Sequence, residues 1–240
     1  VEPLCGGGSD GEYTVLPTGG TPFGSGTYQY QWYVGSNSTA GIIMPGETNQ
    51  TVTGLSASQD YTCLIADASG CTFEYTDQLT EPTELAVIPT ITDVSCNGFS
   101  DGSATLAGGV SGGTPNIGGS YNYLWIDGVT TTINYTNLVA ASYGVTVTDR
   151  NGCELTVPVI ITEPDALTLT VNEVDRVTCS GDADGSAEAI VGGGTGIGTY
   201  TYLWNDDPLS PTTTAIATGL SAGTYDVTIN DASGTCPDET

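Results

Sequence analysis

Hydrophobic and polar residues alternate along three short stretches of the chain, and each stretch begins at a tyrosine. The apolar positions lie two residues apart: Tyr61, Cys63 and Ile65 in the first stretch, Tyr143, Val145 and Val147 in the second, and Tyr225, Val227 and Ile229 in the third. Small or polar residues occupy most of the positions between them. A period of two is typical of a β-strand with one face on a core and the other in water. The pattern therefore predicts three equivalent, half-buried strands.

Each predicted strand leads into a short turn that ends at a cysteine. The turns contain an aspartate, a glycine and the cysteine in that order: Asp67, Gly70 and Cys71; Asp149, Gly152 and Cys153; Asp231, Gly234 and Cys236. Tight turns rich in Asp, Asn, Ser and Gly join antiparallel strands, so each turn predicts a β-hairpin. Strand and hairpin together form a stretch that occurs three times, at residues 55–71, 138–153 and 220–236.

The repetition extends beyond the hairpins and divides the chain of 240 residues into three segments. The sequence Thr-Glu-Pro ends at Pro82 and again at Pro164, and we place the boundaries there. We therefore expect three domains, called here the first, second and third repeats: residues 1–82, 83–164 and 165–240. The first should have an incomplete opening strand and an inserted loop at residues 36–50, and the third should lack its closing strand. The short joints, which contain no Gly/Ser tract, predict limited bending.

No stretch shows a helical period over two turns, which predicts an all-β protein. Each repeat has one tryptophan on a strand near its middle and a tyrosine that begins a later strand, as in an immunoglobulin-like sandwich. We expect the tryptophans in the cores and the tyrosines in corner hydrogen bonds: Trp32, Trp125 and Trp204, and Tyr61, Tyr143 and Tyr225. The sequence thus predicts a tandem array of three immunoglobulin-like β-sandwich repeats. Cys63 is interpreted as an apolar core residue, with a reactive thiol or an inter-chain bridge as the alternatives.

The charge of the chain is strongly negative and excludes several kinds of partner. Arg150 and Arg176 are the two basic residues, there is no Lys or His, and 28 acidic residues bring the formal net charge to -26. Binding of nucleic acid or of an anionic membrane requires a basic surface. No apolar run approaches the ~18 residues of a membrane span, and no signal peptide is visible. Two interpretations of the charge remain open: a solubilising extracellular surface, or a surface whose charge Ca²⁺ partly offsets.

The composition also argues against catalysis. The chain has no His for base catalysis or zinc binding and no Lys for Schiff-base chemistry. No paired carboxylates occur in a recognisable pocket motif. We therefore expect a protein that is not an enzyme and that needs no cofactor, apart from an optional Ca²⁺ ion.

Six of the seven cysteines occupy matching positions in the repeats, which predicts disulfides and an oxidising compartment. Three lie five residues before an Asp-Gly pair, and three follow the hairpins. We favour pairing within each repeat, as Cys5–Cys71, Cys96–Cys153 and Cys179–Cys236. Pairing between repeats, as Cys71–Cys96 and Cys153–Cys179, is equally regular and stays open. A bridge that closes a loop of roughly 60 residues contributes ~4 kcal/mol in the chain-entropy model.

Several polar positions are weaker candidates for sites. The Asp-Gly pairs at Asp10, Asp101 and Asp184 have the chemistry of turns, because Asp accepts backbone N–H bonds and Gly takes positive φ. The alternative for them is a Ca²⁺ site, strongest where Asp182 and Asp184 lie two residues apart, although the EF-hand pattern is absent. Glycosylation sequons occur at three positions: Asn37, Asn49 and Asn134.

All three repeats resemble the SprB-type repeat of giant surface adhesins from gliding bacteria, the first more loosely than the other two, and the resemblance covers most of the chain. In the second repeat the similar residues are DVSCNGFSDGSATL at 93–106 and SYGVTVTDRNGC at 142–153. In the third they are VTCSGDADGSAEA at 177–189 and TGLSAGTYDVTINDASGTC at 218–236. The resemblance implies a secreted cell-surface array of β-sandwiches that works as a stalk, filament or adhesin. It implies no catalysis and identifies no ligand.

The sequence therefore favours a non-catalytic extracellular structural protein, part of a cell-surface filament or adhesin stalk. We expect it to self-associate into a fibre or a longer array. The alternative is an adhesive module that binds a glycan or another surface through the inserted loop at residues 36–50.

Overall fold

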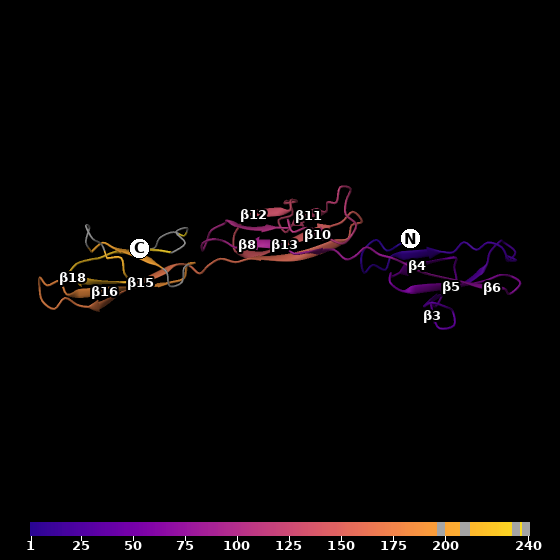
Figure 1. Ribbon diagram of the computed structural model, residues 1–240, viewed down its shortest axis with the longest axis horizontal. Coiled ribbons are helices and arrows are strands. Elements are labelled where there is room, and N and C mark those ends of the chain that lie inside the picture. Colours follow the sequence, from indigo (N-terminus) through magenta and orange to yellow (C-terminus); the bar gives the residue numbers. More distant parts are fainter. Residues whose placement is uncertain (196–199, 207–211, 232–235, 237–240) are drawn as a thin grey trace. The chain divides into compact units, whose positions relative to one another are not determined.

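The computed structural model describes residues 1–195, 200–206, 212–231 and 236. Within these ranges the regular structure consists of β-strands, and no helix is present that could cross a membrane (Figure 1). The chain divides into two compact units: Val1–Ile88 with Gly109–Leu124 and Thr146–Val157, and Pro89–Gly108 with Trp125–Val145 and Pro158–Thr240. These units do not follow the boundaries expected from the repeats, so the division into three domains stays a prediction.

The first unit contains eight complete strands among the described residues: β1 (Gly11–Thr14), β2 (Gln29–Val34), β3 (Ile42–Ile43), β4 (Thr51–Leu55), β5 (Asp60–Ala66), β6 (Thr72–Gln78), β7 (Ala86–Val87) and β10 (Val110–Ser111). A four-stranded antiparallel sheet has the order β3-β2-β5-β6, and β1 pairs with β4 in a second sheet. Strands β7 and β10 form a short separate pair.

The second unit contains the strands β8 (Thr90–Thr92), β9 (Gly102–Thr105), β12 (Asn134–Leu138), β15 (Thr168–Asp175), β16 (Gly185–Gly192), β17 (Thr201–Trp204), β18 (Ile216–Leu220) and β19 (Val227–Asn230). Its sheets have the orders β12-β9-β8, β15-β16-β18 and β17-β19. Three more strands run from one unit into the other and share one sheet in the order β11-β13-β14: β11 (Asn122–Trp125), β13 (Ala141–Thr148) and β14 (Glu154–Ile161).

The predicted alternation of apolar residues builds the cores. In the first unit, Tyr61, Cys63 and Ile65 of β5 are buried with Trp32 and five further apolar residues: Val15, Val52, Leu55, Leu79 and, partly, Tyr13. In the second unit, Val227 and Ile229 of β19 pack with Ala189, Trp204, Ala217 and Leu220. All three tryptophans are at most 1% exposed. The third predicted strand begins later than expected, at Val227 rather than Tyr225.

The N–H and O–H groups of the core tryptophans and corner tyrosines donate hydrogen bonds to backbone carbonyls. The Nε1–H groups of the tryptophans donate to carbonyl oxygens at 2.9–3.0 Å: Trp32 to Asn49, Trp125 to Thr132 and Trp204 to Thr214. The tyrosine hydroxyls donate to carbonyl oxygens four or five residues upstream at 3.0–3.1 Å: Tyr61 to Ser56, Tyr143 to Val139 and Tyr225 to Ser221. A buried tryptophan and a tyrosine corner are features of immunoglobulin-like sandwiches. The predicted all-β, immunoglobulin-like fold is therefore confirmed.

The hairpin aspartates hold their turns closed. Asp67 Oδ1 accepts the N–H groups of Ser69 and Cys71 at 2.9 Å, and its Oδ2 accepts that of Thr21 at 2.9 Å. Asp149 accepts the equivalent bonds from Asn151, Cys153 and Thr114 at 2.7–2.9 Å. In the third repeat Asp231 accepts bonds from the N–H and hydroxyl of Thr195, while the turn at residues 232–235 lies outside the described residues.

The partner threonine always follows two glycines, and the second glycine must approach the aspartate closely. Gly20, Gly113 and Gly194 have φ of +70°, +59° and +66°. A Cβ added at these positions would lie 3.0, 2.8 and 2.3 Å from the aspartate Oδ2. Glycine is therefore required for its positive φ and for the space it leaves. The sequence analysis recognised the aspartates as turn residues but did not connect them with the Gly-Gly-Thr segments.

Hydrogen bonding lowers the pKa of two hairpin carboxyls, those of Asp67 and Asp149. For Asp67 the largest cause is the N–H of Thr21. For Asp149 burial acts in the opposite direction, but the N–H groups of Thr114, Cys153, Asn151 and Gly152 together outweigh it and lower the pKa. A carboxyl whose pKa falls on folding stabilises the fold above its unfolded pKa of about 3.9. That contribution is lost as the pH falls through the lowered folded pKa.

Truncating a core tryptophan should destabilise the first unit strongly. Trp32→Ala removes a fully buried ring and its bond to Asn49, and we expect it to lower the free energy of unfolding by about 3–5 kcal/mol. Phe73→Ala on β6 removes an aromatic side chain that is 66% exposed and serves as the control, with a loss below about 1 kcal/mol. Urea denaturation followed by circular dichroism measures both, and equal losses would contradict the assignment of the core.

Replacing a hairpin aspartate should change the acid sensitivity of the protein. In Asp149→Asn, the amide NH₂ would face the N–H of Thr114, so we expect lower stability at pH 7. Because the variant has no carboxyl to protonate there, the difference from the native chain should shrink below about pH 4. Urea midpoints between pH 7 and pH 2.5 test this, with the exposed Glu154→Gln as control. A difference that stays constant with pH would contradict the role of the charge.

Candidate functional site

Two disulfide bonds are the main chemical feature of the structure. Cys5 bonds to Cys153 with a Cα–Cα distance of 5.6 Å, and Cys96 bonds to Cys236 with a Cα–Cα distance of 5.3 Å. The first bond lies within the first unit and the second within the second unit. In each bond, one cysteine belongs to the loop before an Asp-Gly pair and the other follows the hairpin of the next repeat. We call the region around each bond a joint.

The pairing expected within repeats is wrong, and so is the alternative with Cys71–Cys96 and Cys153–Cys179. The geometry of the first repeat gives the reason. Cys71 directly precedes β6, whereas Gly11, after the Cys5 loop, lies against Leu79 beyond the other end of β6. A strand of seven residues spans about 20 Å. A disulfide needs Cα atoms within about 7 Å, so these two cysteines of one repeat cannot meet.

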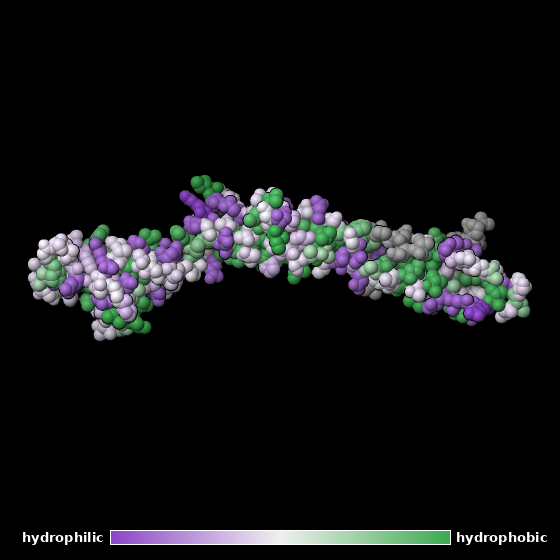
Figure 2. Space-filling view, turned by 180° about the vertical axis from the view of Figure 1, so that it is seen from behind, coloured by the Kyte–Doolittle hydropathy of each residue, from purple (hydrophilic) through white to green (hydrophobic). Residues whose placement is uncertain are grey.

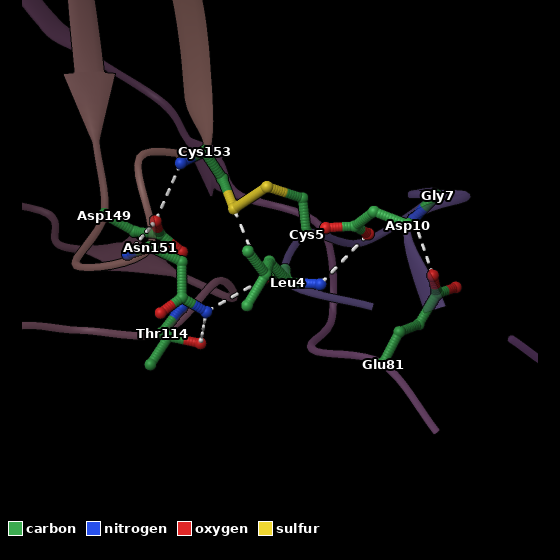
Figure 3. The surroundings of a disulfide bond; sticks show 9 residues. All are labelled: Leu4, Cys5, Gly7, Asp10, Glu81, Thr114, Asp149, Asn151 and Cys153. Atoms are coloured by element: carbon green, nitrogen blue, oxygen red, sulfur yellow. Dashed lines mark hydrogen bonds between the residues drawn. A yellow bond between two sulfur atoms is a disulfide. The ribbon is translucent and has the colours of Figure 1, made fainter. Parts of the chain in front are cut away.

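The joint between Cys5 and Cys153 contains polar contacts around the sulfur atoms (Figure 3). The carbonyl oxygen of Leu4 accepts a bond of 2.9 Å from the side-chain amide of Asn151, and Cys153 Sγ lies 3.4 Å from the same oxygen. On the other side of the loop, the N–H of Gly7 donates to Glu81 Oε2 at 2.9 Å. The loop itself is closed by Asp10, whose Oδ1 accepts the N–H of Leu4.

The joint between Cys96 and Cys236 repeats this arrangement. Cys236 Sγ lies 3.6 Å from the carbonyl oxygen of Ser95, the residue that corresponds to Leu4. The N–H of Gly98 donates to Glu163 Oε2 at 2.7 Å, as Gly7 donates to Glu81. The N–H of Ser95 donates to Asp101 Oδ1 at 3.0 Å, which closes the loop.

The Thr-Glu-Pro sequences are thus part of the joints. The sequence analysis used Pro82 and Pro164 as boundary marks but assigned no role to the glutamates before them. The structure shows that each glutamate binds the cysteine loop of its own repeat, directly before the chain enters the next repeat. A glutamate precedes the proline at both boundaries, and this repetition was the feature of the sequence that could have indicated the role.

The chain that leaves each Thr-Glu-Pro lies against the Gly-Gly pair of the next repeat. Gly113 N–H donates to the Thr83 carbonyl at 2.6 Å, and Gly194 N–H donates to the Asp165 carbonyl at 2.8 Å. A Cβ on the glycine before each would lie within about 2 Å of the carbonyl oxygen of Glu84 or Ala166. The linker, the Gly-Gly pair and the hairpin aspartate therefore pack together beside the hairpin cysteine.

The three remaining cysteines form no disulfide with any described residue. Cys63 is fully buried and lies opposite Trp32 in the sheet register, as expected for an apolar core residue. Burial raises the pKa of its thiol to about 12, so it is not a reactive thiolate. Cys71 and Cys179 are both exposed, which corrects the expectation that all six aligned cysteines are bridged within this chain.

The acidic candidates for Ca²⁺ bind a hydroxyl group of the protein. Thr178 Oγ1 donates to Asp184 Oδ2 at 2.6 Å and lies 3.3 Å from Asp182 Oδ2, and the N–H of Thr178 donates to Asp184 Oδ1. These bonds lower the pKa of Asp184. Within the described residues, no three His, Cys, Asp or Glu side chains are grouped closely enough to hold a metal ion. The Ca²⁺ site stays a prediction.

The three sequons lie in different settings. The side chain of Asn37 accepts the N–H groups of Thr39 and Ala40 at 3.0 and 2.7 Å. Asn49 is exposed and holds Trp32 through its backbone carbonyl, while Asn134 is an exposed residue of β12. Glycosylation at these positions also stays a prediction.

Comparison with known proteins finds one family whose model matches part of this chain. The family model of the SprB repeat matches residues 88–130 and 171–208. Among solved structures, the amphioxus IgVJ-C2 molecule is 16% identical, with 65% of this chain and 97% of that chain covered and a TM-score of 0.27. Domains 3–5 of the Drosophila OTK extracellular region are 14% identical, covering 97% of this chain and 90% of that chain, with a TM-score of 0.24. These TM-scores are too low to carry an argument. No curated protein matches the chain.

The two matched segments include the loop cysteines Cys96 and Cys179 and the core tryptophans Trp125 and Trp204. They contain two of the segments on which the resemblance was inferred from the sequence, residues 93–106 and 177–189. The resemblance is therefore confirmed over residues 88–130 and 171–208, which the SprB repeat model matches.

Proposed function

We propose that this chain is a load-bearing, non-catalytic part of a cell-surface filament or adhesin stalk. The SprB match supports an extracellular adhesin-like repeat. Disulfides persist in oxidising environments, which supports a location outside the cell. A net charge of -26 supports the same setting, because it keeps an exposed array soluble and well separated from its neighbours.

The observation that carries the proposal is the overlap of the two disulfides along the chain. Cys96 lies inside the loop that Cys5–Cys153 closes, and Cys153 lies inside the loop that Cys96–Cys236 closes. A pull on the two ends therefore reaches three stretches in parallel: residues 5–96, 96–153 and 153–236. The shortest stretch limits the extension of the whole chain. Unfolding of the sandwiches then lengthens the tether much less than it would in a chain without these bonds, which is what a load-bearing element requires.

Single-molecule pulling between residues 1 and 240 tests this function. With both bonds intact, we expect the unfolded chain to stop extending at about 220 Å, since roughly 57 residues separate Cys96 from Cys153. After reduction, all 240 residues bear load in series, and the limit should rise to about 800 Å. Equal extensions before and after reduction would refute the load-bearing role.

A matched variant isolates the contribution of one bond. Cys5→Ser with Cys153→Ser keeps the Cys96–Cys236 bond, so residues 1–96 must then extend fully. The limit should be intermediate, at about 340 Å. Cys63→Ser, which alters a cysteine outside both bonds, should leave the native limit of 220 Å unchanged.

A second function, adhesion through the inserted loop, is favoured by a separate observation. Strand β3 within this loop pairs with β2 through Ile42 and Ile43, and these two side chains are 75% and 51% exposed. Figure 1 shows β3 on a protrusion from the first unit, and Figure 2 shows hydrophobic surface on that protrusion among more polar residues. Exposed apolar side chains at a sheet edge are often contact points for a partner.

Replacing the two isoleucines tests the adhesive role without removing the loop. We expect Ile42→Ser with Ile43→Ser to abolish retention of protein-coated beads on a glycan-coated surface, because the contact loses its apolar part. Ile117→Ser, which alters an isoleucine that is 89% exposed elsewhere in the first unit, is the matched control. Retention that survives the double change would rule out this loop as the adhesive element, while the pulling experiment would be unaffected.

A further inference from the structure

We infer that β6 (Thr72–Gln78) is an edge at which a second copy of this chain docks, with the two β6 strands paired antiparallel. The four-stranded sheets of the two copies then form one continuous sheet. The inference goes beyond the load-bearing function proposed above, which concerns a single chain, because it adds a sideways contact between two chains.

Strand β6 is the free edge of the sheet with the order β3-β2-β5-β6. Its seven residues pair with β5 in an unbroken antiparallel register, and no described strand pairs with its other side. Proline residues, bulges and short length are devices that keep an edge strand from pairing with another chain. Strand β6 contains no proline and no bulge, and it is one of the longer strands of the first unit.

The hydrogen bonds to β5 show which backbone groups of β6 point away from the sheet. Asp67 N–H donates to the Cys71 carbonyl at 3.0 Å, and hydrogen-bonded and non-hydrogen-bonded pairs alternate along antiparallel strands. In the observed register, the odd-numbered residues of β6 are therefore bonded to β5. The even-numbered residues direct their N–H and C=O groups outward: Thr72, Glu74, Thr76 and Gln78. Of these, Gln78 N–H already donates to Asp77 Oδ1 at 2.8 Å.

The second repeat shows that such an edge stays free when the preceding linker is in place. There β8, which follows that linker, pairs with β9, and β14 remains the last strand of its sheet. The free edge of β6 therefore does not depend on what precedes the first repeat. At the outward position that corresponds to Thr76, however, β14 has Pro158, which has no N–H group to donate. Of these two edges, β6 is the one that keeps an unbroken row of donors and acceptors.

The two acidic side chains of β6 are bound by groups of their own chain. Glu74 Oε1 accepts the N–H of Ser38 at 3.3 Å and also the hydroxyl of that residue. Asp77 accepts the hydroxyl of Tyr75 and the N–H of Gln78, both at 2.8 Å. Charged side chains that extend freely from an edge strand repel an approaching strand. Because these two carboxylates are held in place by intrachain bonds, that protection is reduced.

The sequence of β6 is complementary to itself, which makes a second copy the partner. Outward-pointing residues must oppose each other to exchange hydrogen bonds, and a two-fold axis at Tyr75 meets this condition over all seven residues. Glu74 then lies opposite Thr76 of the other copy, and Phe73 lies opposite Asp77. No acidic side chain lies opposite another, and two tyrosines form the central cross-strand pair, which is a stabilising combination. An axis at Glu74 would instead place two carboxylates opposite each other.

Sedimentation of the full chain tests whether copies pair. The background carries Cys71→Ser and Cys179→Ser, so that exposed thiols cannot join copies covalently. In about 1 M NaCl, a Debye length of about 3 Å screens the repulsion between two chains of net charge -26. We expect the mass to rise with protein concentration from that of one chain to that of two. A background chain that stays monomeric up to its solubility limit would overturn the inference.

Two substitutions of Thr76 separate the role of its N–H group from that of its side chain. Both Thr76→Pro and Thr76→Ala remove the hydroxyl that bonds to Thr62, but only the proline variant loses the outward N–H. We expect Thr76→Pro to stay monomeric and Thr76→Ala to dimerise like the background. Circular dichroism should show both variants folded, because β14 accommodates Pro158 at the equivalent position. A folded Thr76→Pro variant that still dimerises would refute the pairing.

Cross-linking measures the register and does not depend on the proline variant. The two copies of residue 75 form a non-hydrogen-bonded pair with Cα atoms about 4.5 Å apart, within the range of a disulfide. In oxidised glutathione, Tyr75→Cys in the same background should therefore give a covalent dimer on a non-reducing gel. Glu74→Cys should not, because its two copies lie on a diagonal, about 7–8 Å apart.

Covalent dimers from Glu74→Cys alone, from both variants equally, or from neither would contradict the proposed axis at Tyr75. The single-molecule pulling limits belong to one chain, and no outcome of these association experiments changes them. The sideways contact and the load-bearing function are thus tested separately.

Discussion

The distance between the two cysteine positions of a repeat governs how this chain is cross-linked. In the first repeat, β6 separates Cys71 from the region of the Cys5 loop, and a seven-residue strand is several times longer than a disulfide. A loop cysteine can therefore reach a hairpin cysteine only in a neighbouring repeat. Because of this constraint, disulfides cross-link successive repeats, each of which has a modest core of its own.

The hairpin aspartate links the fold to the joint. Its carboxylate collects N–H groups from its own turn and from the Gly-Gly-Thr segment, and one of the donors is the hairpin cysteine itself. In the second and third repeats, the same Gly-Gly pair receives the incoming linker. The charge that shapes the hairpin thus also sets the position of the sulfur atom and of the chain that enters the repeat. Three segments that are distant in sequence depend on a single carboxylate, which explains why this aspartate is buried although most acidic residues of the chain are solvated.

Each joint combines a covalent disulfide with a weaker hydrogen bond. The disulfide prevents separation, while the hydrogen bond from a loop glycine to the Thr-Glu-Pro glutamate restricts the linker without a covalent bond. Because the two disulfides overlap along the chain, rupture of the weak contacts or of a sandwich core does not expose the full chain to load. Such an arrangement suits a tether better than a binding pocket, whose function requires a cleft with converging polar groups.

The sequence by itself determined the fold class, because a period of two, one tryptophan and one corner tyrosine in each repeat are local signals that need no partner. It also determined the roles of Trp32, Tyr61 and Cys63, which follow from the same alternation of apolar residues. Only the tertiary structure decided which cysteines join, since Cys71 and Cys153 both follow a turn of the form Asp-x-x-Gly, yet Cys153 is bonded to Cys5 and Cys71 is not. The sequence did not predict the roles of Glu81, Glu163 and the Gly-Gly pairs either, because their hydrogen-bond partners lie far away along the chain. Contacts of that kind depend on where the strands end in space. The spacing of residues along the chain does not specify those positions.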